Sequence, residues 1–315
     1  MKQHQINKLE DIINKDYKNI TGIVVMKNDK ILYENYFNGC DRNSHIHVYS
    51  VTKSIVSILV GIAIDKGYIK SIEQNISDFY TVNLRNQNIT LKNLLTMTTP
   101  YRYIIPPYKK YFTSDDWVKF SLDSLSHKKP GKFKYAPLIG PDIISGILVK
   151  TTGKSVLDFA KENLFKPLGI NIKEDIIFHS KEEQLSFNNS IDMNGWVADP
   201  KGINTAGWGL TLSTRDMATI GQLYLNKGKY NDLQIVSKEW IKESTKEQSY
   251  WKKEKLSYGY LWWVSDDGFA AMGDGGNIIY VNTQKQMIVA ITALFQSHVK
   301  DRITFIKKCI EPFIE

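Results

Sequence analysis

A nearly unbroken apolar run between Ser54 and Gly67 predicts a helix that is buried on every side. A helix that is apolar around its whole circumference belongs inside a domain rather than on its surface. Ser50 is well suited to cap such a helix, and glycine at position 67 can end it without strain. The apolar side chains that face all directions are Ile55, Val56, Ile58, Leu59, Val60, Ile62, Ala63 and Ile64.

Patterns near both ends of the chain predict the strands of a sheet. Residues 4–16 have apolar positions at helical spacing, and residues 22–26 and 31–37 are strand-like runs joined by a hairpin turn. A short extended piece, residues 45–49, leads into the buried helix. Toward the other end, strands are expected at 258–264, 269–282 and 287–295, and a final helix at about 299–310.

Residues 68–202 have a different texture, in which helical segments and turn-rich connections dominate. We therefore expect an α+β fold, with one antiparallel sheet flanked by the terminal helices and a large helical insertion. Residues 1–67 and 203–315 would form the sheet domain, and the buried helix would lie where this domain meets the insertion, a preferred place for a ligand site. Residues 171–202 are irregular and polar, as expected of a rim or lid. Helices are expected at 91–98, 114–124, 139–151 and 155–165, from about 213, and near 237–247.

The net charge of +8 on 315 residues comes from lysines scattered along the whole chain. Without a basic block interleaved with aromatic residues, this charge predicts a solvated surface and no nucleic-acid partner. Cys40 and Cys309 stand in separate contexts, which favours a reduced compartment but leaves one disulfide open. The six histidines form no ligand cluster, so we expect no metal site. A polar N-terminal region and a short apolar run predict a cytoplasmic chain without signal peptide or transmembrane segment, of unknown oligomeric state.

Ser50 and Lys53 stand three residues apart, so both side chains lie on the first turn of the buried helix. A serine hydroxyl becomes a good nucleophile when a nearby group takes its proton, and an amine with a lowered pKa can do so. The spacing is weak evidence, because Ser-x-x-Lys recurs at Ser126, Ser249 and Ser297. On spacing alone, an N-cap serine followed by an exposed lysine is the better interpretation.

Six stretches occur in this order along the chain: Ser50-Val51-Thr52-Lys53, residues 89–98, Tyr135 after Pro130-Gly131, residues 205–214, residues 258–263, and Gly273-Asp274-Gly275-Gly276. Together they resemble the serine β-lactamase and penicillin-binding-protein superfamily. The nearest branch is the group of class C β-lactamases, D-alanyl-D-alanine carboxypeptidases and esterases. The likeness covers most of the chain, and several ordered matches are far more specific than any one motif.

The resemblance implies that Ser50 attacks a carbonyl and carries the acyl group. Lys53 would take or relay the serine proton, and Tyr135 would pass a proton to the leaving group and to water. An unperturbed phenol has a pKa of about 10. Neighbouring positive charge would therefore be needed for this phenol to act as a base near neutrality. Without the resemblance, Tyr135 is simply a half-buried loop aromatic.

The same resemblance implies that Asp274, Gly275, Gly276 and Asn277 belong to a late strand that binds substrate. Two glycines would let a substrate lie close against the backbone. The oxyanion hole would use the N–H of Ser50 and that of Asn277, or that of Gly276 if the register differs by one residue. The alternative is a plain strand bulge with glycines.

Two positions depart from the family pattern. The third place of the family's Tyr-x-Asn motif holds Pro137, which has no side-chain amide to contact the substrate and the lysine. The place that usually carries Lys or His in the third motif holds Asp274, which would repel the carboxylate of a penicillin or of a terminal D-alanine. Both changes argue against β-lactam hydrolysis and carboxypeptidase action, while Ser50, Lys53 and Tyr135 remain in place.

We therefore expect a serine hydrolase that forms an acyl-enzyme with an ester or amide, its substrate being a small molecule or short peptide, without metal or organic cofactor. One alternative is a β-lactamase or D,D-peptidase in which another basic residue replaces the missing one. Nitrocefin hydrolysis or covalent penicillin binding would favour it. A second alternative is a non-catalytic binding or sensing descendant, which would show ligand-induced thermal stabilisation without turnover.

Overall fold

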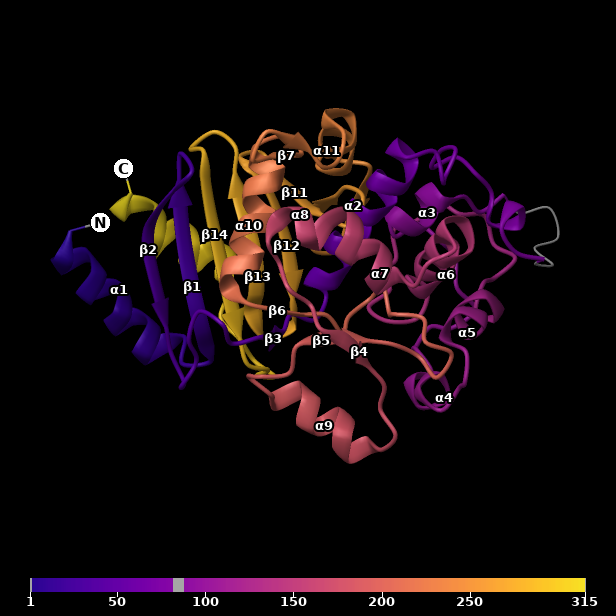
Figure 1. Ribbon diagram of the computed structural model, residues 1–315, viewed down its shortest axis with the longest axis horizontal. Helices are drawn as coiled ribbons and strands as arrows, with labels where there is room; N and C mark the ends of the chain where they lie inside the picture. The colour runs from indigo at the N-terminus through magenta and orange to yellow at the C-terminus, as the bar shows by residue number, and fades with distance from the viewer. Residues whose placement is uncertain (1, 82–87, 315) are drawn as a thin grey trace.

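An antiparallel sheet organises the structure, a computed structural model that describes residues 2–81 and 88–314. Its strands are β1 (Ile20–Lys27), β2 (Lys30–Tyr36), β9 (Ser249–Trp251), β10 (Leu256–Tyr258), β11 (Trp263–Ser265), β12 (Gly268–Gly273), β13 (Asn277–Asn282) and β14 (Met287–Ala293). They lie in the order β2-β1-β14-β13-β12-β11-β10-β9. Because β1 pairs with β14, the two ends of the chain meet inside one sheet (Figure 1).

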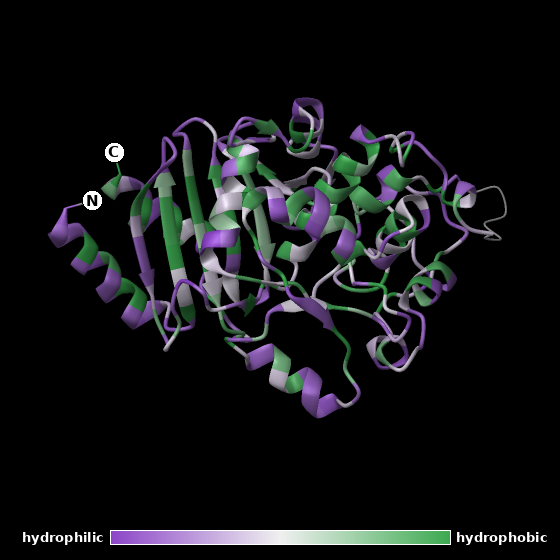
Figure 2. Cartoon of the chain, viewed as in Figure 1, coloured by the Kyte–Doolittle hydropathy of each residue, from purple (hydrophilic) through white to green (hydrophobic). Residues whose placement is uncertain are grey.

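Helices cover both faces of this sheet. The N-terminal helix α1 (Gln3–Asp16) and the C-terminal α12 (Arg302–Phe305) pack on one face, and α2 (Val51–Asp65) and α10 (Thr214–Leu225) pack on the other. Successive residues of a strand point to opposite faces of the sheet. Ile23 therefore packs toward the terminal helices and Val24 toward α2 and α10. Figure 2 shows the matching colours, with apolar strands and a two-sided α1. The expected α+β fold, with its antiparallel sheet flanked by terminal helices, is confirmed.

Helices are the main regular elements in the middle of the chain, although they are shorter than the sequence pattern suggested. Two helices and the small strand pairs were not expected from the sequence. The helices are α3 (Leu91–Leu95), α4 (Tyr108–Phe112), α5 (Trp117–Asp123), α6 (Asp142–Thr152), α7 (Val156–Ala160), α8 (Lys166–Leu168), α9 (Lys181–Asn189) and α11 (Lys238–Ser244). The unexpected helices are α4 and α9. The strand pairs are β3 (Ile46–His47) with β6 (Thr211–Leu212), β4 (Glu174–Ile176) with β5 (Gly195–Val197), and β7 (Lys229–Tyr230) with β8 (Leu233–Gln234).

Two expected strands are wrong as single elements, because each is a pair of antiparallel strands. Residues 258–264 contain the end of β10 and the start of β11, and Leu261 between them has a left-handed φ of 62°. Residues 269–282 contain β12 and β13, which reverse direction through Gly275 and Gly276 at φ values of 77° and 88°. Glycine accepts this conformation without strain, so the glycine pair marks a turn rather than an uninterrupted strand.

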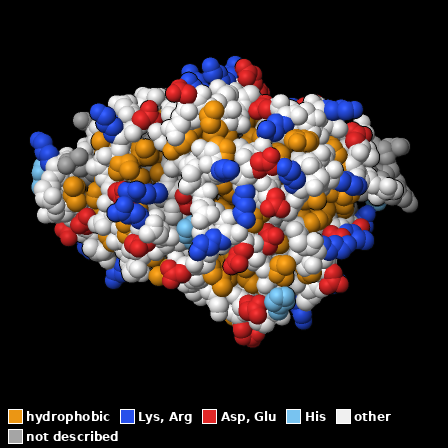
Figure 3. All heavy atoms as spheres, in the orientation of Figure 1, with side chains coloured by type: hydrophobic (Ala, Val, Ile, Leu, Met, Phe, Trp, Pro, Cys, Tyr) orange, Lys and Arg blue, Asp and Glu red, His pale blue; other side chains and the backbone are white. Residues whose placement is uncertain are grey.

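The surface carries charges of both signs in close alternation on the face shown in Figure 3. Cys40 and Cys309 are both free thiols. In the part of the chain that the structure describes, no helix has both the length and the apolar character needed to cross a membrane.

The buried helix expected from the apolar run is confirmed as α2, in which every residue from Val51 to Ala63 is buried. Its small residues allow close packing. A Cβ atom on Gly61 would lie 2.5 Å from Cδ1 of Trp240, a residue of α11. The indole of Trp240 therefore packs directly against the backbone of α2.

Gly61→Ala is expected to lower the free energy of unfolding by about 1–3 kcal/mol, because the added methyl group overlaps the Trp240 ring. Urea denaturation measures the change. In the double variant Gly61→Ala/Trp240→Leu, the smaller side chain should relieve the overlap. The loss of unfolding free energy in the double variant should therefore be smaller than the sum of the losses in the two single variants. Simple additivity would contradict this account of the contact.

Candidate active site

The hydroxyl of Ser50 stands at the start of α2 without serving as a cap. Ser50 has helical dihedrals (φ −70°, ψ −4°), and its side chain makes no capping hydrogen bond. The residue before it, Tyr49, has a left-handed φ of 50°, which turns the chain sharply into the helix. Ser50 as a whole is partly exposed.

Lys53 is buried beside this hydroxyl, with only 1% of its surface exposed. Its Nζ lies 2.9 Å from Ser50 Oγ, 2.7 Å from the carbonyl oxygen of Pro137 and 2.6 Å from that of Gly207. The interpretation of Ser50 as a cap followed by an exposed lysine is therefore wrong, since the lysine is interior and the serine faces it.

The environment of Lys53 favours its neutral form. Burial lowers the pKa of Lys53 to about 7, against a smaller opposing effect of the carboxylates of Asp274 and Asp142. A neutral amine has two N–H groups and one lone pair. The carbonyls of Pro137 and Gly207 can accept the two N–H groups, which leaves the lone pair facing the Ser50 hydroxyl.

Two backbone carbonyls thus have a role that the residue types do not reveal. Pro137, which lacks the family's side-chain amide, contacts Lys53 through its main chain instead. A Cβ atom on Gly207 would lie 2.7 Å from the Pro137 oxygen, so glycine is needed for both carbonyls to approach the amine. The glycine-rich stretch at 207–209 was the available sequence signal for this approach.

A buried carboxylate fixes the segment that carries Gly207. Asp142 of α6 accepts a hydrogen bond from Ala206 N at 3.0 Å and another from Tyr111 Oη at 2.6 Å. Burial raises the pKa of Asp142 to about 7. Asp142 therefore positions the carbonyl of the following residue toward Lys53.

Tyr135 comes from the loop before α6, and its ring centroid lies 5.2 Å from Lys53 Nζ. Burial raises the pKa of the Tyr135 phenol, and a hydrogen bond with the Ser50 side chain acts in the opposite direction. The group is therefore a neutral phenol, suited to donate a proton rather than to act as a phenolate base. Trp251 and Trp263 pack against its ring at centroid distances of 6.2 and 5.5 Å, which restricts its orientation.

The stretch from Gly273 to Asn277 forms the turn between β12 and β13. Gly273 lies against the start of α2, since a Cβ atom there would be 3.2 Å from Ser50 N. Gly275 lies beside the Leu294 carbonyl and Gly276 beside the Arg302 guanidinium. The Asn277 side chain is buried, and its Nδ2 donates to the carbonyl of Asp274 at 2.8 Å.

Arg302 of α12 holds this turn from the other side. Its guanidinium donates to Asn19 Oδ1 at 2.7 Å and to the carbonyl oxygens of Gly275 and Gly276 at 3.3 Å. Asn19 Nδ2 donates to the Gly275 carbonyl as well, at 2.7 Å. The turn beside Ser50 is thus tied to residues near both ends of the chain.

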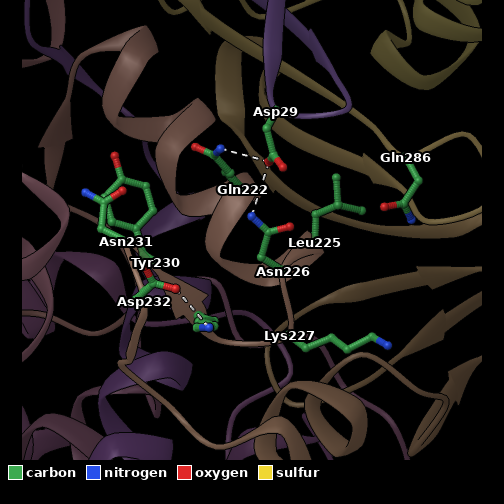
Figure 4. Close-up of a pocket in the computed structure, with 10 residues that line it drawn as sticks. Asp29, Gln222, Leu225, Asn226, Lys227, Tyr230, Asn231, Asp232 and Gln286 are labelled. Carbon is green, nitrogen blue, oxygen red and sulfur yellow. Dashed lines mark hydrogen bonds and ion pairs between the residues drawn. The ribbon is translucent and has the colours of Figure 1, made fainter.

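The pocket drawn in Figure 4, of about 570 Å³, lies at the opposite end of the sheet from Ser50. It adjoins the β1–β2 turn, whose Asn28 N donates to Gln286 O in the β13–β14 turn. Asp29 Oδ1 there accepts hydrogen bonds from Gln222 and Asn226, at 2.9 and 3.2 Å. Its described lining residues include no serine, cysteine or histidine, and Asp232 there pairs with Lys229.

The fold is the one found in β-lactamases and penicillin-binding proteins, as similar solved structures show. A Bacillus anthracis protein assigned as a 6-aminohexanoate-dimer hydrolase has a TM-score of 0.74 and 20% identity, over 97% of this chain and 81% of its own. A class C β-lactamase from Rhodobacter sphaeroides has a TM-score of 0.72 and 16% identity over 100% of both chains. EstCE1, a hydrolase with promiscuous acyltransferase activity, has a TM-score of 0.70 and 13% identity over 93% of both.

The family itself follows from the sequence match. Residues 10–304 match the Beta-lactamase family, which is nearly the whole chain, so the protein belongs to that family.

The lowered pKa of Lys53 predicts a pH-dependent stability. In the unfolded chain the lysine has a pKa of about 10.4 and stays protonated up to that pH. In the folded protein its pKa is about 7, so it loses the proton above that pH. Between these values the unfolded state holds more protons, so the stability of the wild type should rise with pH relative to Lys53→Met. The rise is at most about 1.4 kcal/mol per pH unit, measured by urea denaturation at pH 7, 8 and 9. Lys129→Met controls for losing a surface charge, and a pH-independent difference for Lys53→Met would refute a lowered pKa.

Proposed function

We propose that this protein is a serine hydrolase that cleaves an ester or amide through an acyl-enzyme on Ser50. The observation that carries the proposal is the 2.9 Å contact between the Ser50 hydroxyl and the buried amine of Lys53. The names of its structural neighbours, which include a 6-aminohexanoate-dimer hydrolase, a hydrolase with promiscuous acyltransferase activity and a class C β-lactamase, support the same reaction class.

In the first half of the reaction, Lys53 removes the proton of Ser50 as the serine oxygen attacks the substrate carbonyl carbon. The negative charge that develops on the carbonyl oxygen needs hydrogen-bond donors. Within the described residues the Ser50 N–H donates no other hydrogen bond, so it is free for this role. The second donor would come from the backbone of the turn from Gly273 to Asn277, of which Gly273 lies nearest to Ser50 N.

Collapse of the tetrahedral intermediate breaks the bond to the leaving group. The departing oxygen or nitrogen takes a proton from the Tyr135 phenol, which Lys53 replaces with the proton received from Ser50. Water then attacks the acyl-enzyme by the same route in reverse, and Ser50 regains its proton when the acid is released. The neutral state of Tyr135 suits it to this donor role.

The expected substrate is an ester or amide without a carboxylate near the scissile bond. Asp274 stands where the related enzymes carry a basic residue, and its negative charge disfavours penicillins and peptides that end in D-alanine. Nitrocefin hydrolysis and covalent penicillin binding test this exclusion directly.

A fluorophosphonate probe should label the wild type at Ser50, because the probe reacts with serines whose hydroxyl is activated by a base. Ser50→Ala should abolish labelling and p-nitrophenyl ester hydrolysis. Ser126→Ala, which changes a second Ser-x-x-Lys serine, should retain both. Mass spectrometry of the labelled peptide identifies the site, and a probe that reacts elsewhere or not at all would refute the proposal.

Tyr135→Phe should reduce activity more when the leaving group needs a proton. A p-nitrophenolate can leave without being protonated, whereas an alkoxide needs a proton. The loss of kcat/KM should therefore be on the order of a hundredfold for an ethyl ester and clearly smaller for the p-nitrophenyl ester. The matched control is Tyr258→Phe, which removes another phenol from the same aromatic cluster, 6.4 Å away. Equal losses for both esters would rule out proton donation by Tyr135.

A further inference from the structure

The turn after β12 places a carboxylate at the edge of the proposed site. Gly273 is in contact with the backbone at Ser50, and the next residue, Asp274, is exposed. Within residues 2–81 and 88–314, the Asp274 carboxylate makes no hydrogen bond and no ion pair. Its charge is therefore not neutralised by a partner of its own.

The influence of Asp274 extends to groups on several sides of the site. It opposes the lowering of the Lys53 pKa by burial. Burial is the main cause of the raised pKa of Tyr49, Tyr108 and Tyr135, and the Asp274 carboxylate is a further cause for each. The Asp274 carboxylate therefore acts on groups that lie on several sides of Ser50.

The groove beside Asp274 has room for part of a substrate. It has a volume of about 570 Å³ and runs from the β12–β13 turn to residues 295–302. Phe295 lines it with 52% of its surface exposed, and its ring centroid lies 5.8 Å from that of Tyr49. An aromatic face of this kind attracts cations.

The other charged groups of the groove are already engaged. Lys300 Nζ pairs with Asp16 Oδ1 at 2.6 Å, and the guanidinium of Arg302 donates to Asn19 and to the carbonyls of the turn. Asp301 Oδ1 accepts from Thr304 N at 2.6 Å as the cap of α12. Among the charged side chains that line the groove, in the part of the chain described, the Asp274 carboxylate is therefore the one that has neither a hydrogen bond nor an ion pair.

We propose that the enzyme selects esters or amides that carry an ammonium group, which Asp274 binds at the turn beside Ser50. This inference rests on the function proposed above and adds the substrate class. An exposed ion pair changes binding by about two- to fivefold. The preference should therefore be modest, should depend on Asp274, and should shrink as added salt screens it.

Three thioesters with the same butyryl group test the charge of the leaving group. Their thiols are thiocholine, the uncharged 3,3-dimethylbutanethiol and the anionic 3-mercaptopropionate, and Ellman's reagent detects each released thiol in one assay. A second pair, with 4-(trimethylammonio)butanoyl and 5,5-dimethylhexanoyl groups on one thiol, tests the acyl side. We expect kcat/KM to be about two- to fivefold higher for the cation than for its uncharged isostere in at least one set, and lowest for the anion.

The ratio of cationic to neutral rates within each variant gives the result. Asp274→Asn should bring the ratio close to one, and Asp274→Lys should reverse it. Asp266→Asn, which removes an exposed carboxylate at the opposite end of β12, should leave the ratio as in the wild type. If Asp274→Lys does not fold, Asp274→Asn carries the test.

Two failures are distinguishable. Thiol release that requires Ser50 but has the same ratio in the wild type and in Asp274→Asn would overturn the role of Asp274 and leave the hydrolase standing. If none of the five thioesters shows thiol release that depends on Ser50, both the proposed hydrolase activity and the ammonium preference are overturned.

Discussion

The whole arrangement depends on an amine enclosed by protein yet able to lose its proton. Lys53 has three polar contacts, and two of them are carbonyl oxygens that lie 84 and 154 residues farther along the chain. Neither carbonyl carries a full charge, so neither holds the proton on the amine as a carboxylate would. The fold thus supplies enough polarity to bury a lysine without fixing it in its charged form.

This requirement explains features that would otherwise look unrelated. Position 207 is a glycine because two peptide carbonyls must converge on the Lys53 nitrogen. Asp142 is buried because its carboxylate accepts a hydrogen bond from the backbone N–H of Ala206, which holds the segment before Gly207. The apolar helix α2 supplies the rigid wall from which Ser50 and Lys53 project. The apolar core, the loop that carries Gly207 and the buried carboxylate of Asp142 all help to hold Lys53 against the Ser50 hydroxyl.

Much of this was accessible from the sequence, because the signals were local. The apolar run fixed α2, hydrophobic periodicity gave α1, and the serine–lysine spacing with the ordered motifs singled out Ser50, Lys53 and Tyr135. What could not be predicted depends on backbone direction. Nothing in the identity of Pro137 tells where its carbonyl points, and the glycines at 275 and 276 suit a strand that admits a substrate as well as a turn that reverses the chain.

The guanidinium of Arg302 gives the ends of the chain an unexpected importance. It anchors the β12–β13 turn from α12 while Asn19, just beyond α1, braces the same peptide groups. The turn beside Ser50 is thereby held by two segments that lie 283 residues apart in the sequence. This turn can take its final shape only once α12 has docked, so a chain without α12 would keep Ser50 beside Lys53 but leave the neighbouring turn unsupported.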